Sequence, residues 1–168
     1  MPRSFDLSAY YPVAVESVRA VFGDEEYWLA RLADSGADFA TLDSMVIEQD
    51  GRVIVGTTQA LRPDRLPAVV TQFHRGDLQI LRTESWSPVT DGTAHAELNG
   101  SVAGAPVALV GTAELAPTDS GSRMTFRATV EVNIPLVGGK LESFIGGKLA
   151  ELVSAEQQFT TVWIAENA

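Results

Sequence analysis

The sequence predicts an α+β fold in which a curved antiparallel sheet of seven strands wraps around one long C-terminal helix. Residues 140–167 carry the only long pattern of helical periodicity. Most of the chain before them alternates with a period of two between turn residues, which is typical of antiparallel strands. Two short helical patterns lie between the first two of these strands. The 168 residues contain no linker, so they predict a single domain, 1–168.

The C-terminal helix is expected from Lys140 to Asn167, and it needs a large apolar partner. At about 1.5 Å per residue, it would be roughly 40 Å long. One stripe of its surface is apolar at helical spacing. The stripe consists of Leu141, Ile145, Leu149, Leu152, Phe159 and Trp163. Because most of the remaining chain predicts strands, we expect the sheet to be the partner.

The N-terminal segment predicts one strand followed by two short helices. Residues 4–10 alternate between apolar and polar side chains, as a strand does. The segment Ala14–Phe22 has its apolar residues at helical spacing. Asp24 is a suitable N-cap for the second helix, Glu25–Asp34, and Gly36 is a suitable residue to end it.

The middle of the chain predicts six further strands. Asp50-Gly51 is a strong signal for a hairpin between the first two, whose mixed alternation leaves their inward face open. Residues 66–73 predict a short helix or an ordered loop, and Pro117–Gly121 predicts a turn. The expected strands are Phe39–Glu48, Arg52–Leu61, Asp77–Ser87, Thr93–Val102, Val107–Ala116 and Ser122–Ile134.

The order of these elements resembles the helix-grip fold of the START and pollen-allergen-like superfamily (SRPBCC), which also holds polyketide cyclases. The opening YPVAVESVRAVFGDEEYWLARL is similar to the usual first segment of that superfamily. The runs RTESW, IPLVGGKLESFIGGKLAEL and FTTVWI resemble more specifically an actinobacterial family of unknown function, numbered 2505. The resemblance covers nearly the whole chain. It implies a helix-grip fold and carries no known reaction.

Composition excludes several classes of function. The formal net charge is −10, so the surface should repel phosphate backbones and anionic lipids, and we expect no nucleic-acid partner. The absence of cysteine excludes disulfides, thiolate metal sites and a cysteine nucleophile. The N-terminus shows no signal peptide, and no run of 18 apolar residues predicts a membrane span. These features favour a cytoplasmic protein.

The chain offers no motif for a metal or a cofactor. His74 and His95 do not have the spacing of metal ligands, and no acidic cluster complements them. The glycine pairs at 138–139 and 146–147 each precede a lysine but lack the rest of a phosphate-binding loop. These glycines indicate instead close packing on a strand, a kink or room for a ligand. We therefore expect no metal, no cofactor and no catalytic motif.

The strand Asp77–Ser87 carries charge on its more apolar face. Arg82 and Glu84 share that face with Trp86, about 6.6 Å apart along the strand. A buried charge is costly unless it is paired. Arg82 and Glu84 therefore predict either an ion pair at the edge of the sheet or a polar anchor inside an apolar cavity, where Arg82 could hold a carboxylate, an enolate or a phenolate.

Glu156 is a second charged residue in an apolar setting. It lies near the middle of the helical stripe, between Leu152 and Phe159. If no cation were near, burial would raise the pKa of its carboxyl. If Arg82 reached it instead, the pKa would be lowered and removal of the carboxylate would destabilise the fold.

These observations predict a carrier or sensor that binds a hydrophobic small molecule or lipid between the sheet and the long helix. The alternative is an aromatic polyketide cyclase or dehydratase, in which Arg82 polarises a carbonyl and Glu84 or Glu156 moves a proton. The sequence does not predict the ligand or the oligomeric state. The candidate ligand-binding residues are Arg82, Glu84, Trp86, Phe126, Val130, Leu149, Leu152, Glu156 and Phe159.

Overall fold

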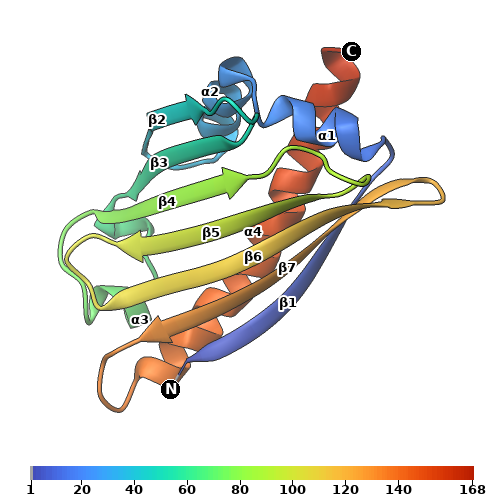
Figure 1. The fold of residues 1–168 in the computed structure, drawn as a ribbon. Helices are drawn as coiled ribbons and strands as arrows, with labels where there is room; N and C mark the ends of the chain where they lie inside the picture. Colours follow the sequence, from blue (N-terminus) through green and yellow to red (C-terminus); the bar gives the residue numbers. More distant parts are fainter. Residues whose placement is uncertain (1) are drawn as a thin grey trace.

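A seven-stranded antiparallel sheet curves around a long C-terminal helix in the computed structural model, which describes residues 2–168 (Figure 1). The predicted helix-grip fold is therefore confirmed. The sheet order is β1-β7-β6-β5-β4-β3-β2, so only the pairing of β1 with β7 joins strands distant in the chain. The elements are β1 (Arg3–Tyr11), α1 (Val15–Val21), α2 (Glu25–Asp34), β2 (Phe39–Ile47), β3 (Val53–Leu61), a 3-10 turn (Pro63–Arg65), α3 (Ala68–Thr71), β4 (Leu78–Trp86), β5 (Ala94–Val102), β6 (Val107–Thr118), β7 (Gly121–Val132) and α4 (Gly138–Glu166).

The predicted boundaries lie within two residues of the observed ones, and the local signals act as expected. Asp24 caps α2, since its Oδ1 accepts a hydrogen bond from the amide of Glu26 at 3.0 Å. Gly36 follows that helix with a φ of +79°, and Gly51 turns the β2–β3 hairpin with a φ of +95°. Both values favour glycine, because a Cβ atom disfavours the left-handed region.

The turn expected at Pro117–Gly121 is shorter than predicted. β6 continues through Pro117 to Thr118, and Pro117 lies opposite Ser122 of β7. Pairing between β5 and β6 has already ended at Leu115, which lies opposite Ala94. Beyond that point β6 has only β7 beside it, and an edge position of this kind tolerates a residue without an N–H group.

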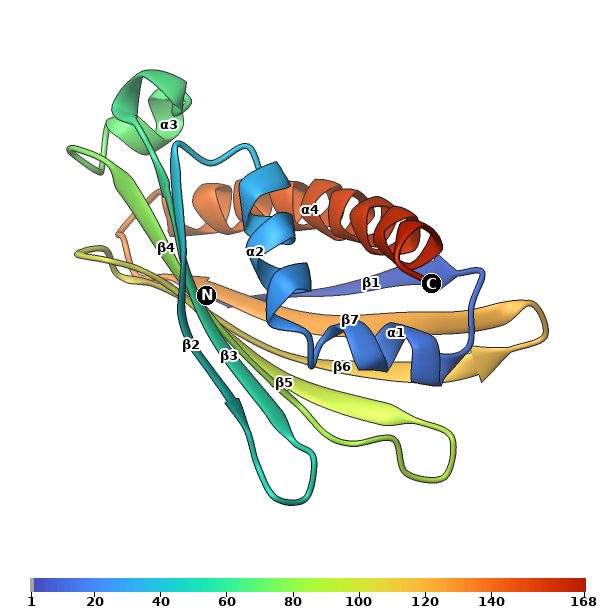
Figure 2. The ribbon, with the colours of Figure 1, turned by 90° about the horizontal axis from the view of Figure 1, so that it is seen from above.

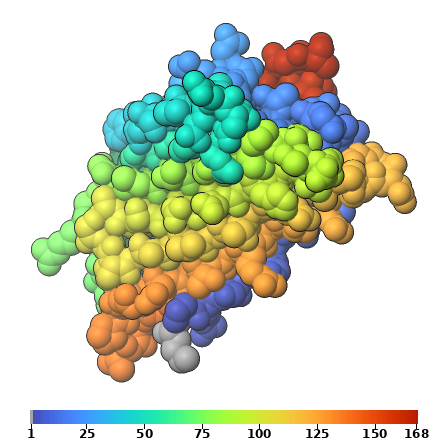
Figure 3. Space-filling model, in the orientation of Figure 1, coloured from blue at the N-terminus to red at the C-terminus, as the bar shows by residue number. Residues whose placement is uncertain are grey.

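The sheet presents its concave side to the helices. Figure 2 shows α1 and α2 over one end of this side, α3 at the other end, and α4 along β1 and β7. Figure 3 shows the opposite, convex face, over which the strands lie side by side without a covering helix. The concave side therefore holds the apolar core.

The inward faces of β4 and β7 are those that alternation predicts. On β7, Val130 and Val132 are buried, and Phe126 is half-buried against the larger core cluster. On β3, whose inward face the sequence left open, Val53 and Val55 are buried.

The core consists of two clusters, and the larger one has more buried members than the smaller one. The larger one lies beneath α1 and α2 and is rich in fully buried aromatic side chains such as Tyr27, Trp28 and Trp86. The smaller one has only Val130, Val132 and Leu141 as buried members, at the end where α4 begins. Around this second cluster, most apolar side chains are only partly buried.

The face of α4 that packs on β1 and β7 combines an apolar, a charged and a glycine residue, which are Leu141, Glu142 and Gly146. Gly146 lies directly against the ring of Phe5, where a Cβ atom would overlap ring carbons. Glu142 is fully buried, and its Oε2 accepts a hydrogen bond from the amide of Val132 at 2.9 Å. Leu141 of the predicted apolar stripe is buried with Val130 and Val132 of β7, and several other members of the stripe are only half-buried. Among residues 2–168, no helix has both the length and the apolarity to cross a membrane.

The close contact between α4 and β1 predicts opposite effects for two adjacent glycines. Gly146→Ala should lower the free energy of unfolding by about 1–3 kcal/mol, because the new methyl group meets the Phe5 ring. Gly147→Ala is the matched control: a Cβ there meets nothing within 4 Å. It should raise stability by up to about 1 kcal/mol through helix propensity. Denaturant unfolding of both variants measures the difference, and equal effects would contradict the packing role of Gly146.

Candidate functional site

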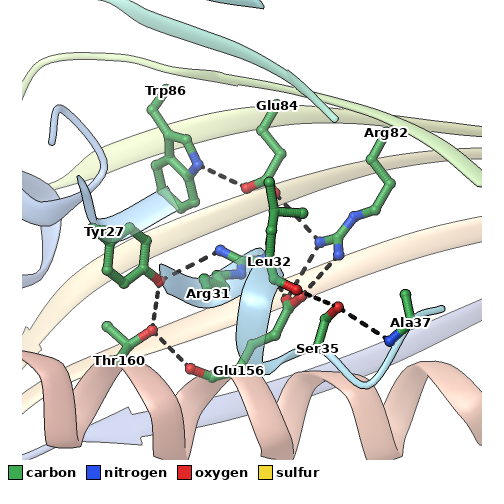
Figure 4. Close-up of polar contacts among 10 residues, drawn as sticks. All are labelled: Tyr27, Arg31, Leu32, Ser35, Ala37, Arg82, Glu84, Trp86, Glu156 and Thr160. Carbon is green, nitrogen blue, oxygen red and sulfur yellow. Dashed lines mark hydrogen bonds and ion pairs between the residues drawn. The ribbon is translucent and has the colours of Figure 1, made fainter. Parts of the chain in front are cut away.

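Four charged side chains from three elements meet between the sheet and the helices (Figure 4). Arg82 and Glu84 come from the inward face of β4, Arg31 from α2 and Glu156 from α4. We call these residues the charge cluster. Between 10% and 23% of each side chain is exposed. The cluster therefore holds two positive and two negative charges in a largely dry environment.

Glu156 is the centre of the charge cluster. Its Oε2 accepts a hydrogen bond from Nη1 of Arg82 at 2.8 Å, and its Oε1 lies 2.6 Å from Nη2 of Arg31. Nη2 of Arg82 also donates to Glu84 at 3.3 Å, and Nη2 of Arg31 lies 3.6 Å from the same carboxylate. Each carboxylate therefore faces both guanidinium groups, which offsets the cost of burying all four charges.

The electrostatic balance keeps the charge cluster ionised. Burial by itself would raise the pKa of Glu156, but Arg31 and Arg82 outweigh burial and lower the pKa of this carboxyl from 4.5 to about 2. Burial by itself would lower the pKa of both guanidinium groups. Glu156 and Glu84 outweigh this effect and raise the pKa of Arg31 and that of Arg82 above the ordinary value. Of the two outcomes considered for Glu156, the structure therefore supports the one in which Arg82 reaches it.

Hydrogen bonds extend the charge cluster into the larger core. Thr160 Oγ1 donates to the carbonyl of Glu156 at 2.7 Å, so its lone pairs accept from the hydroxyl of Tyr27, also at 2.7 Å. Tyr27 in turn lies 3.4 Å from Nη1 of Arg31, and burial raises the pKa of its phenol. On the other side, Nε1 of Trp86 donates to Glu84 at 3.1 Å. The charged groups are thus oriented by neighbours that are themselves buried.

A small pocket of about 80 Å³ adjoins the charge cluster. Its wall includes Arg82 and two polar residues of β3, Thr57 and Gln59. Thr57 is only 7% exposed, and neither its hydroxyl nor the amide of Gln59 has a hydrogen-bond partner in the described residues 2–168. The lining residues are Trp28, Arg31, Leu32, Asp34, Ser35, Thr57, Gln59, Arg82, Glu84, Leu152, Ala155, Glu156 and Phe159. The pocket thus offers unpaired hydrogen-bonding groups to a small polar moiety.

The structure brings most of the sequence-predicted site residues together. Arg82, Glu84 and Glu156 form the charge cluster, and Trp86 bonds to it. Leu152 and Phe159 line the pocket. Three others lie elsewhere, because the helix and the strand that carry them run on past the pocket: Phe126 packs on the larger core cluster, and Val130 and Leu149 belong to the smaller one.

Arg31 was not predicted from the sequence, although its position in α2 carries a signal. Buried residues of α2 follow a helical pattern, and Arg31 lies on that face four residues after Tyr27. Its position matches that of Glu156, a single charge on an apolar stripe. Two charges of opposite sign on apolar helical stripes would have suggested a pair. Thr57 and Gln59 gave no such signal, because the inward face of β3 was not defined.

The described part of the chain contains no group of three or more potential metal ligands. His95 lies on the exposed face of β5, with Nδ1 3.9 Å from Glu114. His74 bonds through Nε2 to the carbonyl of Asp77 at 3.0 Å. Neither histidine approaches the charge cluster, so the chemistry of the site rests on carboxylates, guanidinium groups and neutral polar groups.

Comparison with known proteins finds matches in both sequence and fold. A family model described as a protein of unknown function (DUF2505) matches residues 6–164. Uncharacterized proteins of Mycobacterium bovis and Mycobacterium tuberculosis are 50% identical to this chain over 173 residues, and each match covers 99% of both chains.

Several solved structures share the fold at low identity. The protein TTHA0849 from Thermus thermophilus has a TM-score of 0.64 and 16% identity. The protein Ara h 8.0201 has a TM-score of 0.57 and 8% identity, and a START superfamily protein from Mycobacterium smegmatis has 0.51 and 10%. Each match covers 99% of both chains. Identities this low show the fold alone.

The geometry of the charge cluster predicts that Glu156→Gln destabilises the protein at neutral pH. The loss should be about 3 kcal/mol, because two buried guanidinium groups are left with a single carboxylate. Since folding lowers the pKa of Glu156, its stabilisation is complete above pH 4.5 and is lost as the pH falls towards 2.

Denaturant midpoints of the wild type and Glu156→Gln at pH 7 and pH 3 test this prediction. The two proteins should differ at pH 7 and approach each other at pH 3, while other titrating groups act equally on both. Equal midpoints at pH 7 would show that the ion pairs contribute nothing to stability.

Proposed function

This chain belongs to the DUF2505 family, and we propose that it is a carrier or sensor that binds a hydrophobic small molecule or lipid between the sheet and α4. The fold supports this proposal, since START-like and Ara h 8-like neighbours suggest a ligand-binding fold. One observation carries it further: apolar side chains on facing elements, next to the polar pocket, are left half-exposed.

The part of the α4 stripe around Leu152 faces β4. Leu152 lines the pocket beside Arg82, and Glu156 reaches Arg82 directly. Leu149 and Ile145 precede Leu152 by three and seven residues, so they lie on the same side of the helix. All three apolar side chains are only partly buried. Ile145 and Leu149 also pack against the smaller core cluster, so the apolar surface offered to a ligand is the part that this packing leaves uncovered.

The sheet presents matching side chains. Leu78 and Ile80 share the inward face of β4 with Arg82, and Val102 of β5 lies opposite Ile80. The three are half-buried, and none belongs to either core cluster. Each Å² of apolar surface that a ligand removes from water contributes roughly 25 cal/mol. An apolar ligand body between these residues and α4 would gain this free energy.

The pocket supports an orientation for the ligand. Its volume of about 80 Å³ is well below the roughly 300–1,000 Å³ of small-molecule sites, so it suits a polar head group and not a whole ligand. Thr57 and Gln59 supply free hydrogen-bonding groups. We therefore place the head group in the pocket and the apolar body against Ile80 and Leu152.

Charge balance favours an uncharged head group. Arg31 and Arg82 are already neutralised by Glu84 and Glu156, and an additional carboxylate would leave one buried charge uncompensated. An acidic ligand held by Arg82 would first have to displace Glu156. Anchoring of an acidic group by Arg82 stays a prediction that the experiments below test.

The lowered pKa of Glu156 does not favour this residue as the proton carrier of the cyclase alternative. With a pKa of about 2, Glu156 has no proton to donate near neutral pH and is a weak base. A general acid or base near neutrality needs a pKa close to the working pH. Binding requires no such group.

We predict saturable, one-to-one binding of an apolar fluorophore that Ile80→Asn weakens. The substitution places an amide among the apolar contacts of the ligand body. Leu81→Asn is the matched control, because Leu81 lies on the convex face and is 41% exposed. Fluorescence titration of the three proteins measures the effect. Equal affinities for both variants, or no saturable binding by the wild type, would overturn the proposed location.

A second binding prediction concerns the head group. The wild type should bind a long-chain alcohol more tightly than the carboxylate of the same chain length, because the charge cluster is neutral. Glu156→Gln removes one negative charge and should shift this preference towards the carboxylate. Competition with the fluorophore measures both affinities, after circular dichroism has shown that the variant is folded. A wild type that prefers the carboxylate would support Arg82 as an acid anchor instead.

A further inference from the structure

We propose that the end of the molecule at which β7 leads into α4 docks on the surface of an anionic phospholipid membrane. We call this end the docking end. It comprises Arg3, the segment 62–77 that contains α3, and the segment 133–140 between β7 and the first turn of α4. The inference concerns a surface outside the charge cluster, and it does not depend on the proposed ligand.

The docking end carries an apolar tip that the fold does not bury. Leu136 has a relative exposure of 105%, and its backbone is held at a φ of +73°. This conformation is uncommon for a residue other than glycine and disfavoured by its Cβ atom. Phe73, just after α3, is 45% exposed. An exposed leucine with a disfavoured backbone conformation does not stabilise the folded protein. A partner that buries this side chain would explain why it is exposed.

Contacts and figures place the two apolar segments at the same end. Val69 of α3 and Val137 of the β7–α4 connection both pack against the smaller core cluster. Figures 1 and 2 agree in showing α3 and this connection at the end opposite the β6–β7 turn. The segments that carry Leu136 and Phe73 therefore lie at the same end of the molecule.

Charge differs between the two ends. The docking end holds five basic residues against two acidic ones; these are Arg3, Arg62, Arg65, Arg75 and Lys140 against Asp64 and Asp77. Carboxylates next to these segments balance two of the cations, because Arg65 pairs with Asp38 at 3.2 Å and Arg3 lies 4.0 Å from Glu142. Among residues 2–168, Arg75 and Lys140 make no ion pair. At the opposite end, each of the three strand connections carries an aspartate: Asp50, Asp91 and Asp119. The net charge of −10 conceals this polarity.

This polarity revises the expectation that the whole surface repels anionic lipids. Basic residues near an anionic bilayer contribute about 1 kcal/mol each, and screening confines the effect to about a Debye length. The acidic turns lie at the far end and would point away from the bilayer. An apolar tip flanked by basic residues matches a membrane interface, where apolar side chains enter the acyl boundary and cations meet the head groups. Nucleic acid would attract the same cations but offer nothing to Leu136.

Vesicle co-sedimentation tests the proposal. The wild type should bind vesicles of phosphatidylcholine mixed with phosphatidylglycerol, bind pure phosphatidylcholine vesicles much less, and dissociate as salt is raised. Lys140→Gln should weaken binding by about fivefold, the loss expected for one interfacial charge. Leu136→Asn should weaken it several-fold while keeping a residue that tolerates positive φ.

Val110→Asn is the control for loss of an exposed apolar side chain. Val110 is 59% exposed on the convex face of β6, and its replacement should leave vesicle binding unchanged. Equal thermal midpoints of the variants would show that binding, and not folding, is measured. The proposal is overturned if no vesicle binds, if both vesicle types bind equally, or if Leu136→Asn behaves like Val110→Asn. The last outcome would leave Leu136 available for a protein partner instead.

Discussion

The pairing of Glu156 with two guanidinium groups is the interaction on which the rest of this structure depends. It joins α4 to α2 through Arg31 and to β4 through Arg82. Apart from this cluster, α4 packs chiefly along β1 and β7, at one side of the concave face (Figure 2). The ion pairs therefore tie α4 to α2 and β4, beside the ring contacts of Phe159 and Trp163 with Tyr27 of α2. The charge cluster has no net charge, because Glu84 supplies the second carboxylate.

The charge cluster also divides the interior into two unlike parts. On the side of α1 and α2, aromatic side chains such as Trp28 and Trp86 are almost completely buried. On the side of the docking end, apolar side chains of α4 and β4 remain half-exposed. A fold that only needed stability would have closed this second part with larger side chains. The unequal packing is consistent with a region kept for a ligand.

The position of α4 on the sheet depends on Gly146. This glycine lets the ring of Phe5 approach the helix axis, next to the buried contacts of Leu141 with β7. Further along the helix, Leu152 and Phe159 of the apolar stripe line the pocket. The docking end lies where this stripe begins, so an apolar molecule leaving a bilayer would meet Ile145 and Leu149 first. The position of α4 on the sheet, which depends on Gly146, therefore affects both the proposed binding region and the proposed membrane surface.

By itself, the sequence determined the fold class, the elements to within two residues and the inward faces of β4 and β7. These depend on local periodicity and turn chemistry, which neighbouring residues encode. It also singled out Arg82, Glu84 and Glu156 as charges in apolar settings. Only the tertiary structure decided that Arg31 joins them, that the pKa of Glu156 is lowered and that Thr57 lines the pocket. Each of these depends on contacts between segments distant in the chain, whose distances and register no local pattern contains.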